Sequence, residues 1–116
     1  MSVSRKLLLV EDEDSIRLSL RDFLVDKGYD VMVASDGLGA IRQLTDYDFD
    51  LIISDYRMDN LGGSYWVRFL SKFCSSVPVL IISGFLPGDT ELPFPVVYKP
   101  FDYDDILIKI EEVMGG

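Results

Sequence analysis

The sequence predicts a doubly wound α/β fold, in which one parallel sheet lies between layers of helices. Short apolar runs recur along the chain without polar and apolar residues alternating, which is typical of strands buried on both faces of a sheet. Segments with apolar residues at helical spacing separate these runs. The alternation of strand and helix covers the whole chain, and right-handed crossovers then place the strands in one parallel sheet.

Four apolar runs predict the buried strands of this sheet. Each is short and rich in leucine, valine or isoleucine, and they cover residues 7–10, 51–53, 79–82 and 96–98. A strand with both faces buried has no reason to alternate polar and apolar residues, so these continuous runs fit that environment. A fifth run, over residues 31–34, is weaker and suits an edge strand.

Apolar residues at helical spacing predict the helices. Two stripes are well defined, Ile16, Leu20, Phe23 and Leu24 in the first, and Trp66, Phe69, Leu70 and Phe73 in the second. We expect the first helix to begin with Asp14 as its N-cap and to close at Gly28. We interpret the second stripe as core packing. Weaker stripes are Ala40, Ile41 and Leu44, and Ile106, Ile110 and Val113.

Residues 84–95 interrupt the alternation of strands and helices before the last predicted strand. They hold Pro87, Pro93 and Pro95, and no apolar stripe longer than one helical turn. Proline has no backbone N–H to donate and restricts the residue before it, so a regular helix is disfavoured here. We expect the fourth helix to be shortened or missing.

Length and composition predict a single domain over residues 1–116. The formal net charge is −9, whereas proteins that bind nucleic acids present clustered Lys and Arg, so we expect no nucleic-acid partner. No stretch approaches the roughly 18 apolar residues of a membrane span, and the first residues lack a signal-peptide pattern. We therefore expect a cytoplasmic protein without membrane association.

The chain has one cysteine, Cys74, and no histidine. One cysteine cannot close an internal disulfide, and zinc sites or histidine-dependent catalysis need residues that this composition lacks. We interpret Cys74 as a small core residue.

Polar residues follow the four predicted buried strands. They are Glu11 and Asp12, Asp55, Ser83 and Lys99, in chain order. Because the carboxyl ends of parallel strands meet at one edge of the sheet, these side chains should converge in one crevice. Three carboxylates, one hydroxyl and one amine would meet there.

This combination favours phosphoryl chemistry with Mg²⁺. Carboxylates packed together repel one another unless a cation joins them, and hard oxygen ligands suit Mg²⁺. An aspartate beside a bound metal can attack a phosphoryl donor and form an acyl phosphate. Lys99 would place a positive charge near the phosphoryl oxygens, and Ser83 would offer a hydroxyl donor.

These residues resemble the receiver domains of two-component response regulators, and also those of hybrid histidine kinases, over essentially the whole chain. The matching motifs are LVED at residues 9–12, LIISD at 51–55 with Met58 and Gly63 after it, ISG at 82–84 and YKPF at 98–101. Each motif alone is weak. All of them in this order, at the predicted strand ends, are highly specific.

The resemblance implies a flavodoxin-like sheet of order 2-1-3-4-5 and a role in phosphorelay signalling. It implies that Asp55 is the phosphoacceptor, and that a sensor histidine kinase or histidine phosphotransfer protein supplies the phosphoryl group. Phosphorylation would then switch a surface that binds an unidentified downstream protein. We expect a monomer or weak dimer, with no enzymatic activity beyond self-phosphorylation and self-dephosphorylation.

The resemblance also implies the metal ligands. Asp12, Asp55 and the backbone carbonyl of Arg57 would bind Mg²⁺ directly, whereas Glu11 would act through water. A cis peptide bond would precede Pro100.

Three departures from the family pattern concern signal output. Asp59 stands where a proline usually follows the methionine, Val96 stands where an aromatic switch residue is common, and the segment before the last strand is short. Tyr98 is no obvious substitute for that aromatic residue, because it points to the other face of the sheet from Lys99.

Three other functions remain open. A Mg²⁺-dependent phosphatase or phosphotransferase would share a nucleophilic aspartate, but usually carries an acid/base aspartate two residues later, where this chain has Arg57. A receiver-like binding module without phosphorylation would not need the intact set of polar residues. A flavodoxin-type cofactor protein would need a phosphate-binding loop where Glu11 and Asp12 stand. Glu13 and Asp14 can equally be explained as acids that favour the positive N-terminus of the first helix.

Overall fold

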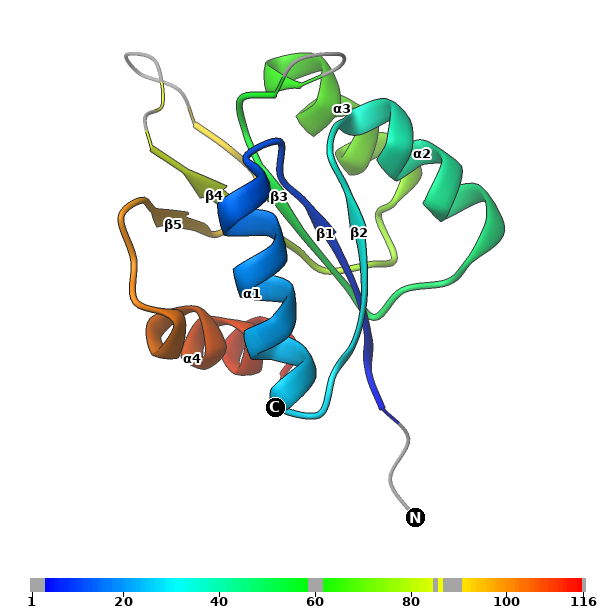
Figure 1. The fold of residues 1–116 in the computed structure, drawn as a ribbon. Coiled ribbons are helices and arrows are strands. Elements are labelled where there is room, and N and C mark those ends of the chain that lie inside the picture. Colours follow the sequence, from blue (N-terminus) through cyan, green and yellow to red (C-terminus); the bar gives the residue numbers. More distant parts are fainter. Residues whose placement is uncertain (1–3, 59–61, 85, 87–90, 116) are drawn as a thin grey trace.

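The computed structural model describes residues 4–58, 62–84, 86 and 91–115. The elements in chain order are β1 (Lys6–Val10), α1 (Asp14–Asp26), β2 (Asp30–Ala34), α2 (Gly37–Asp46), β3 (Leu51–Asp55), α3 (Gly63–Phe73), β4 (Val79–Ser83), β5 (Val96–Tyr98) and α4 (Tyr103–Val113). Figure 1 shows the sheet with α1 and α4 on one face and α2 and α3 on the other. Within the described residues, no helix is long and apolar enough to cross a membrane.

The five strands are all parallel and lie in the order β2-β1-β3-β4-β5, as predicted. Leu8 in β1 lies opposite Met32 of β2 and Ile52 of β3, so β1 is bonded on both sides. The weak apolar run forms β2, which lies at one edge of the sheet, also as predicted.

Alternate residues of the central strands serve two separate cores. Leu8 and Ile52 point to the α2 and α3 side, where they pack with Trp66 and Leu70 of α3. Their neighbours Leu7, Leu9, Leu51 and Ile53 join a second cluster with Leu20, Leu24, Ile106 and Ile110 of α1 and α4. A strand that supplies apolar side chains to both faces cannot alternate polar and apolar residues, which explains the continuous runs.

The strand over residues 96–98 was wrongly predicted to be buried on both faces. Val96 and Val97 are half-buried, and Tyr98 is 56% exposed. The physical reason is its position, because β5 lies at the edge of the sheet and bonds only to β4.

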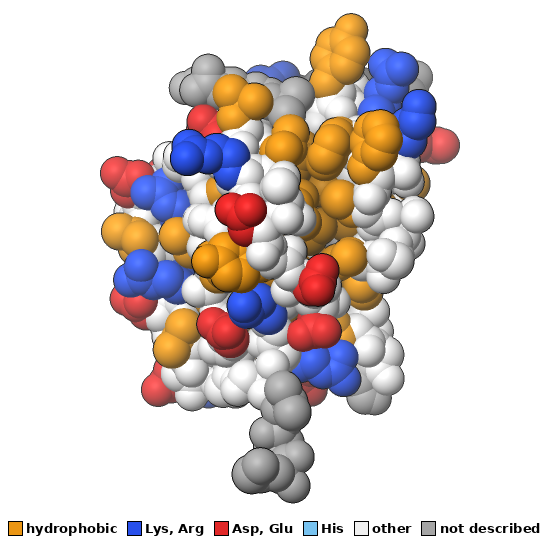
Figure 2. All heavy atoms as spheres, turned by 90° about the vertical axis from the view of Figure 1, so that its right-hand side faces the viewer, with side chains coloured by type: hydrophobic (Ala, Val, Ile, Leu, Met, Phe, Trp, Pro, Cys, Tyr) orange, Lys and Arg blue, Asp and Glu red, His pale blue; other side chains and the backbone are white. Residues whose placement is uncertain are grey.

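The apolar stripe of α3 is core over part of its length. Trp66 and Leu70 are fully buried, and Phe69 stacks on Trp66. The prediction that Phe73 is core was wrong, since its side chain is 66% exposed at the last turn of the helix. It lines a hollow between α2 and α3 together with half-buried Cys74, and Figure 2 shows hydrophobic side chains gathered on this face.

The N-cap of α1 was also predicted one residue too late. The cap is Glu13, which has extended backbone geometry, and Asp14 is the first helical residue. Asp14 pairs with Arg17 one turn later. The predicted end at Gly28 is confirmed, because its φ of 99° lies in the left-handed region that glycine adopts without strain.

The prediction that the fourth helix of the pattern is shortened or missing is confirmed, because α3 and α4 are the only described helices after β3. The described residues between β4 and β5 are not helical. Leu92 and Phe94 are half-buried there and pack against the core on the α2 and α3 side. This stretch therefore covers the sheet as an irregular segment with apolar anchors. Asp59, Pro87 and Gly88 lie outside the described residues.

Candidate metal centre at the strand ends

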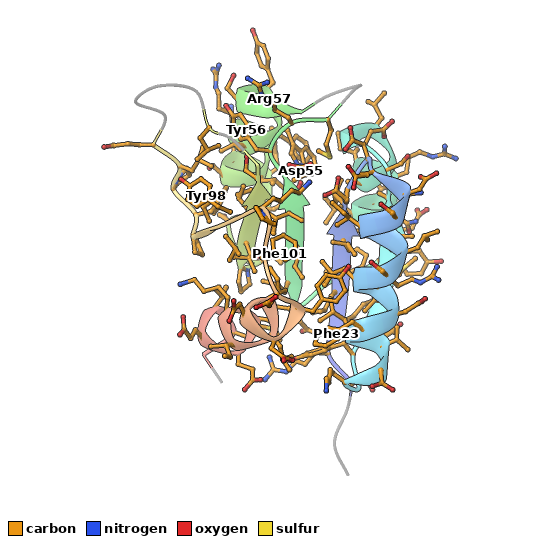
Figure 3. All side chains as sticks on the ribbon, turned by 60° about the vertical axis from the view of Figure 1, so that its left-hand side comes forward. Phe23, Asp55, Tyr56, Arg57, Tyr98 and Phe101 are labelled. Carbon is orange, nitrogen blue, oxygen red and sulfur yellow. The ribbon has the colours of Figure 1, made fainter. Side chains whose placement is uncertain are left out.

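The predicted site residues meet at one end of the sheet. Glu11 follows β1 and donates its backbone N–H to Ala34 of β2, while Asp55 and Ser83 are the last residues of β3 and β4. Lys99 follows β5 and donates its backbone N–H to Ser83. Figure 3 shows Asp55 at the end of its strand, with Tyr56 and Arg57 leading into the next turn.

Three carboxylates form a cluster at this edge. One carboxylate oxygen from each of Glu11, Asp12 and Asp55 lies within 4.8 Å of the others. Glu11 is fully buried and Asp55 is 5% exposed, whereas Asp12 is open to solvent. The cluster is therefore buried on one side and reachable from solvent on the other.

Lys99 balances part of this charge. Its Nζ lies 2.6 Å from Oε1 of Glu11 and donates a hydrogen bond to Oδ2 of Asp55 at 3.0 Å. Burial alone would lower the pKa of Lys99, but its contacts with these two carboxylates outweigh burial and raise that pKa above its usual value. The amine is thus protonated and shared between the two acids.

One buried oxygen of Glu11 retains capacity for another donor. Its Oε2 accepts the backbone N–H of Glu13 at 3.1 Å. Its Oε1 is buried against the Lys99 ammonium at 2.6 Å and, among the described residues, accepts no further hydrogen bond. A metal-bound water would offer this oxygen a second donor beside Lys99.

The charge on Asp12 is also incompletely compensated. Partial burial, followed by the neighbouring Glu11 carboxylate, raises the pKa of Asp12. A cation bound among the three acids would relieve this repulsion. The all-oxygen donor set, with one exposed carboxylate, fits a hard cation such as Mg²⁺ that retains several waters.

The turn after β3 closes the site on the side of α3. Asp12, Arg57, Met58, Gly62 and Gly63 line an open depression of about 430 Å³. A Cβ atom at Gly62 would lie 2.7 Å from the backbone nitrogen of Met58, so only glycine fits there. Gly62 was not among the predicted site residues, although a double glycine before a helix is a signal of close backbone approach.

The structure thus brings together all six predicted site residues. Glu11, Asp12 and Asp55 form the acidic cluster, Lys99 bonds to it, and Arg57 lines the depression beside it. Ser83 is buried at the end of the neighbouring strand β4. The predicted cis peptide bond between Lys99 and Pro100 is present.

Comparison with known families agrees with this geometry. The model of the response regulator receiver domain matches residues 7–92. The chain therefore belongs to the response regulator receiver domain family. Members of this family are phosphoacceptor switches in two-component signalling rather than enzymes that turn over a substrate, and they interact with histidine kinases.

Curated relatives are longer than this chain. The probable transcriptional regulator ycf29 of Pyropia yezoensis is 30% identical over 97% of the chain and 54% of its own length. The transcriptional regulatory protein ZraR of Klebsiella oxytoca is 29% identical over 94% of the chain and 26% of its length. The sensor kinase CckA of Brucella abortus is 28% identical over 98% of the chain and 13% of its length. The chain spans about half or less of each relative.

Solved structures share the fold. The chemotaxis response regulator CheY4 of Vibrio cholerae superposes with a TM-score of 0.86 at 27% identity, over 96% of this chain and 99% of CheY4. The response regulator TrrA of Thermotoga maritima, solved in complex with Mg²⁺-BeF, gives a TM-score of 0.84 at 23% identity, over 94% of this chain and 98% of TrrA.

Proposed function

We propose that the protein accepts a phosphoryl group on Asp55, in a Mg²⁺-dependent reaction, from a phosphohistidine on a sensor histidine kinase or a histidine phosphotransfer protein. The observation that carries this proposal is the cluster of three carboxylates within 4.8 Å, with Lys99 bonded to the buried pair. These 116 residues hold no histidine, so the donor histidine lies outside them.

Each site residue has a distinct role in this proposal. Asp12, Asp55 and the backbone carbonyl of Arg57 hold the metal, and Glu11 holds it through a water that donates to its buried Oε1. Bound Mg²⁺ supplies positive charge that screens the incoming phosphoryl oxygens from the carboxylates. The binding of Mg²⁺-BeF by TrrA supports the choice of metal, because both chains share this fold.

The reaction exchanges one bond for another. A carboxylate oxygen of Asp55 attacks phosphorus, the bond between phosphorus and the imidazole nitrogen breaks, and the imidazole leaves with the electron pair. Asp55 thereby loses its own negative charge. Lys99, which donates to Asp55 in the resting state, can then donate to a phosphoryl oxygen, and Ser83 offers a second donor.

The replacement of the Asp55 carboxylate charge by a charged phosphoryl group is the physical basis of the proposed switch. The new phosphoryl oxygens attract Ser83, the last residue of β4, and Lys99, which follows the adjacent strand β5, and a change at these strand ends alters the surface beyond them. A downstream protein that binds one arrangement of this surface more tightly would respond to phosphorylation of Asp55. We propose a single domain over residues 1–116, monomeric or weakly dimeric, that works in the cytoplasm without contacting nucleic acid.

A set of small phosphodonors tests this function against the phosphatase alternative. Phosphoramidate has a phosphorus–nitrogen bond like that of phosphohistidine, and with Mg²⁺ it should leave one phosphoryl group on the protein. p-Nitrophenyl phosphate should not be hydrolysed with repeated turnover, because Arg57 occupies the position of the usual acid/base aspartate. Steady release of nitrophenol, without modification by phosphoramidate, would favour the phosphatase.

A further inference from the structure

A chain of two buried hydrogen bonds links α3 to the phosphoacceptor strand. The indole Nε1–H of Trp66 donates to Oγ of Ser54 at 2.7 Å, and the Ser54 hydroxyl donates to the backbone carbonyl of Asp55 at 2.9 Å. Trp66 and Ser54 are fully buried. An indole N–H can only donate, so Ser54 Oγ must accept it and has one proton left, which is directed at Asp55.

These bonds act on the backbone that leads out of β3. The peptide group between Asp55 and Tyr56 is held at its oxygen by Ser54 and at its nitrogen by a bond from Tyr56 N–H to Ile82 at 3.1 Å. The next peptide group is held at the Tyr56 carbonyl, which accepts the N–H of Gly63 at 2.6 Å. Two successive peptide groups are therefore fixed before the chain reaches Arg57.

We propose that Trp66 and Ser54 are positioning residues of the acceptor site. They touch neither the phosphoryl group nor the metal, and they act through the Asp55 carbonyl by fixing the direction in which the chain enters the turn. We call the two hydrogen bonds from Trp66 through Ser54 to the Asp55 carbonyl the relay. The turn supplies the Arg57 carbonyl, so the relay sets the geometry of one metal ligand relative to the Asp55 side chain. The metal part of this inference rests on the proposed function.

Loss of the relay and loss of ordinary core packing should change different properties of the protein. Loss of packing lowers the stability of the whole domain and leaves the site unchanged in molecules that remain folded. Loss of the relay removes one of the bonds that hold the peptide groups around Tyr56, so that these groups loosen and a metal ligand is misplaced. Residues that orient metal ligands typically change metal affinity about 10-fold to 100-fold when removed.

Two variants remove the hydrogen bonds with little change of shape. Ser54→Ala deletes the central hydroxyl, and 3-benzothienylalanine in place of Trp66 exchanges the indole N–H for sulfur. Phe69→Leu is the control, because Phe69 stacks on Trp66 at 5.6 Å between ring centroids but is no part of the relay. Each protein is studied as the full chain.

Amide hydrogen exchange without metal is the first measurement. In both relay variants, the amides of Tyr56 and Gly63 should exchange about 10-fold faster relative to that of Leu80 in β4, which reports global unfolding. The control should change all three amides together. If the amides of Tyr56 and Gly63 follow Leu80 in the relay variants as well, the inference is overturned.

The second measurement is the dependence of phosphorylation on Mg²⁺ concentration. Half-saturation should shift upward about 10-fold in the relay variants, with the rate at saturating Mg²⁺ changed less than about twofold. Unchanged half-saturation in both variants would contradict the positioning role. A wild type that accepts no phosphoryl group would refute the proposed function instead, and the exchange experiment would still decide on the relay.

Discussion

Lys99 at the end of β5 donates a hydrogen bond to Asp55 at the end of β3, with 3.0 Å between Nζ and Oδ2. The same amine lies 2.6 Å from the fully buried carboxylate of Glu11. One cation therefore serves two buried acids, and exposed Asp12 adds a third negative charge. The resting site is electrostatically strained in a way that a metal ion would relieve, and this strain can be measured.

Lys99→Met should destabilise the metal-free protein by about 3 kcal/mol at pH 7, because it leaves two buried carboxylates without their cation. The raised pKa of Lys99 means that its stabilisation is complete below the usual pKa of lysine and is lost only as the pH rises through the raised value. Urea unfolding measures the loss.

The control for this variant is Lys109→Met on α4. Lys109 also pairs with an acid, Glu112 at 3.3 Å, but this pair is exposed and should contribute less than about 0.5 kcal/mol. Mg²⁺ should restore more stability to Lys99→Met than to Lys109→Met. Equal losses in the two variants would refute the shared-cation account.

Asp12→Asn should raise the melting temperature of the metal-free protein by roughly 2 to 4 °C and reduce the stabilisation by Mg²⁺. The pKa of Asp12 is raised in the folded state, so its ionisation is unfavourable above that pKa and the penalty disappears as the pH falls through it. The advantage of the variant should therefore shrink towards acidic pH.

Thermal melts at several pH values, with and without Mg²⁺, test this. Glu13→Gln is the matched control, since Glu13 caps α1 and is not part of the acidic cluster. If Mg²⁺ raises the melting temperature of Asp12→Asn as much as that of the wild type, Asp12 is not a ligand of the metal.

Leu92→Ala should cost about 1 to 2 kcal/mol, less than a fully buried leucine, because Leu92 is a half-buried anchor of the segment that replaces a helix. Equilibrium urea unfolding provides the value. Glu91→Ala, at an exposed neighbouring position, should stay within about 0.5 kcal/mol of the wild type. Equal costs would mean that this segment does not anchor through its apolar side chains.

The segment over residues 84–95 should become more ordered when the site is activated. We expect movement of Ser83 towards a phosphoryl group to pull on Gly84, and because the described part of this segment has no helix, we expect a change in loop order with Gly84 as a hinge. Hydrogen exchange of the free and beryllofluoride-bound forms should show new protection there. Strong helical protection in both forms would exclude this output.

The sequence predicted the sheet correctly, and it predicted the edge at which the candidate site residues lie, because that edge is set by the strand ends. Continuous apolar runs located the strands, and parallel topology then required Asp55, Ser83 and Lys99 to meet. The predictions of burial were wrong where burial depends on the position of an element in the fold. Residues 96–98 have the composition of a central strand, although the order 2-1-3-4-5 implied by the family resemblance already places them at an edge, as the structure does.

The hydrogen-bond partners of individual side chains could not be predicted from the sequence for a similar reason. Trp66 was correctly predicted to be buried, yet its bond to Ser54 depends on how α3 is rotated on the sheet, which apolar spacing does not determine. The same holds for Phe73, which continues the stripe but lies at the helix end, where the core no longer covers it.

Intact-protein mass spectrometry tests the central claim most directly. Wild type and Asp55→Asn are incubated with acetyl phosphate, either with Mg²⁺ or with a chelator, and peptide mapping locates any modification. The account predicts one phosphoryl group on wild-type Asp55 with Mg²⁺, and none with the chelator or in the variant. A wild type that stays unmodified under saturating donor and Mg²⁺, or an Asp55→Asn protein modified as fully as the wild type, would contradict it.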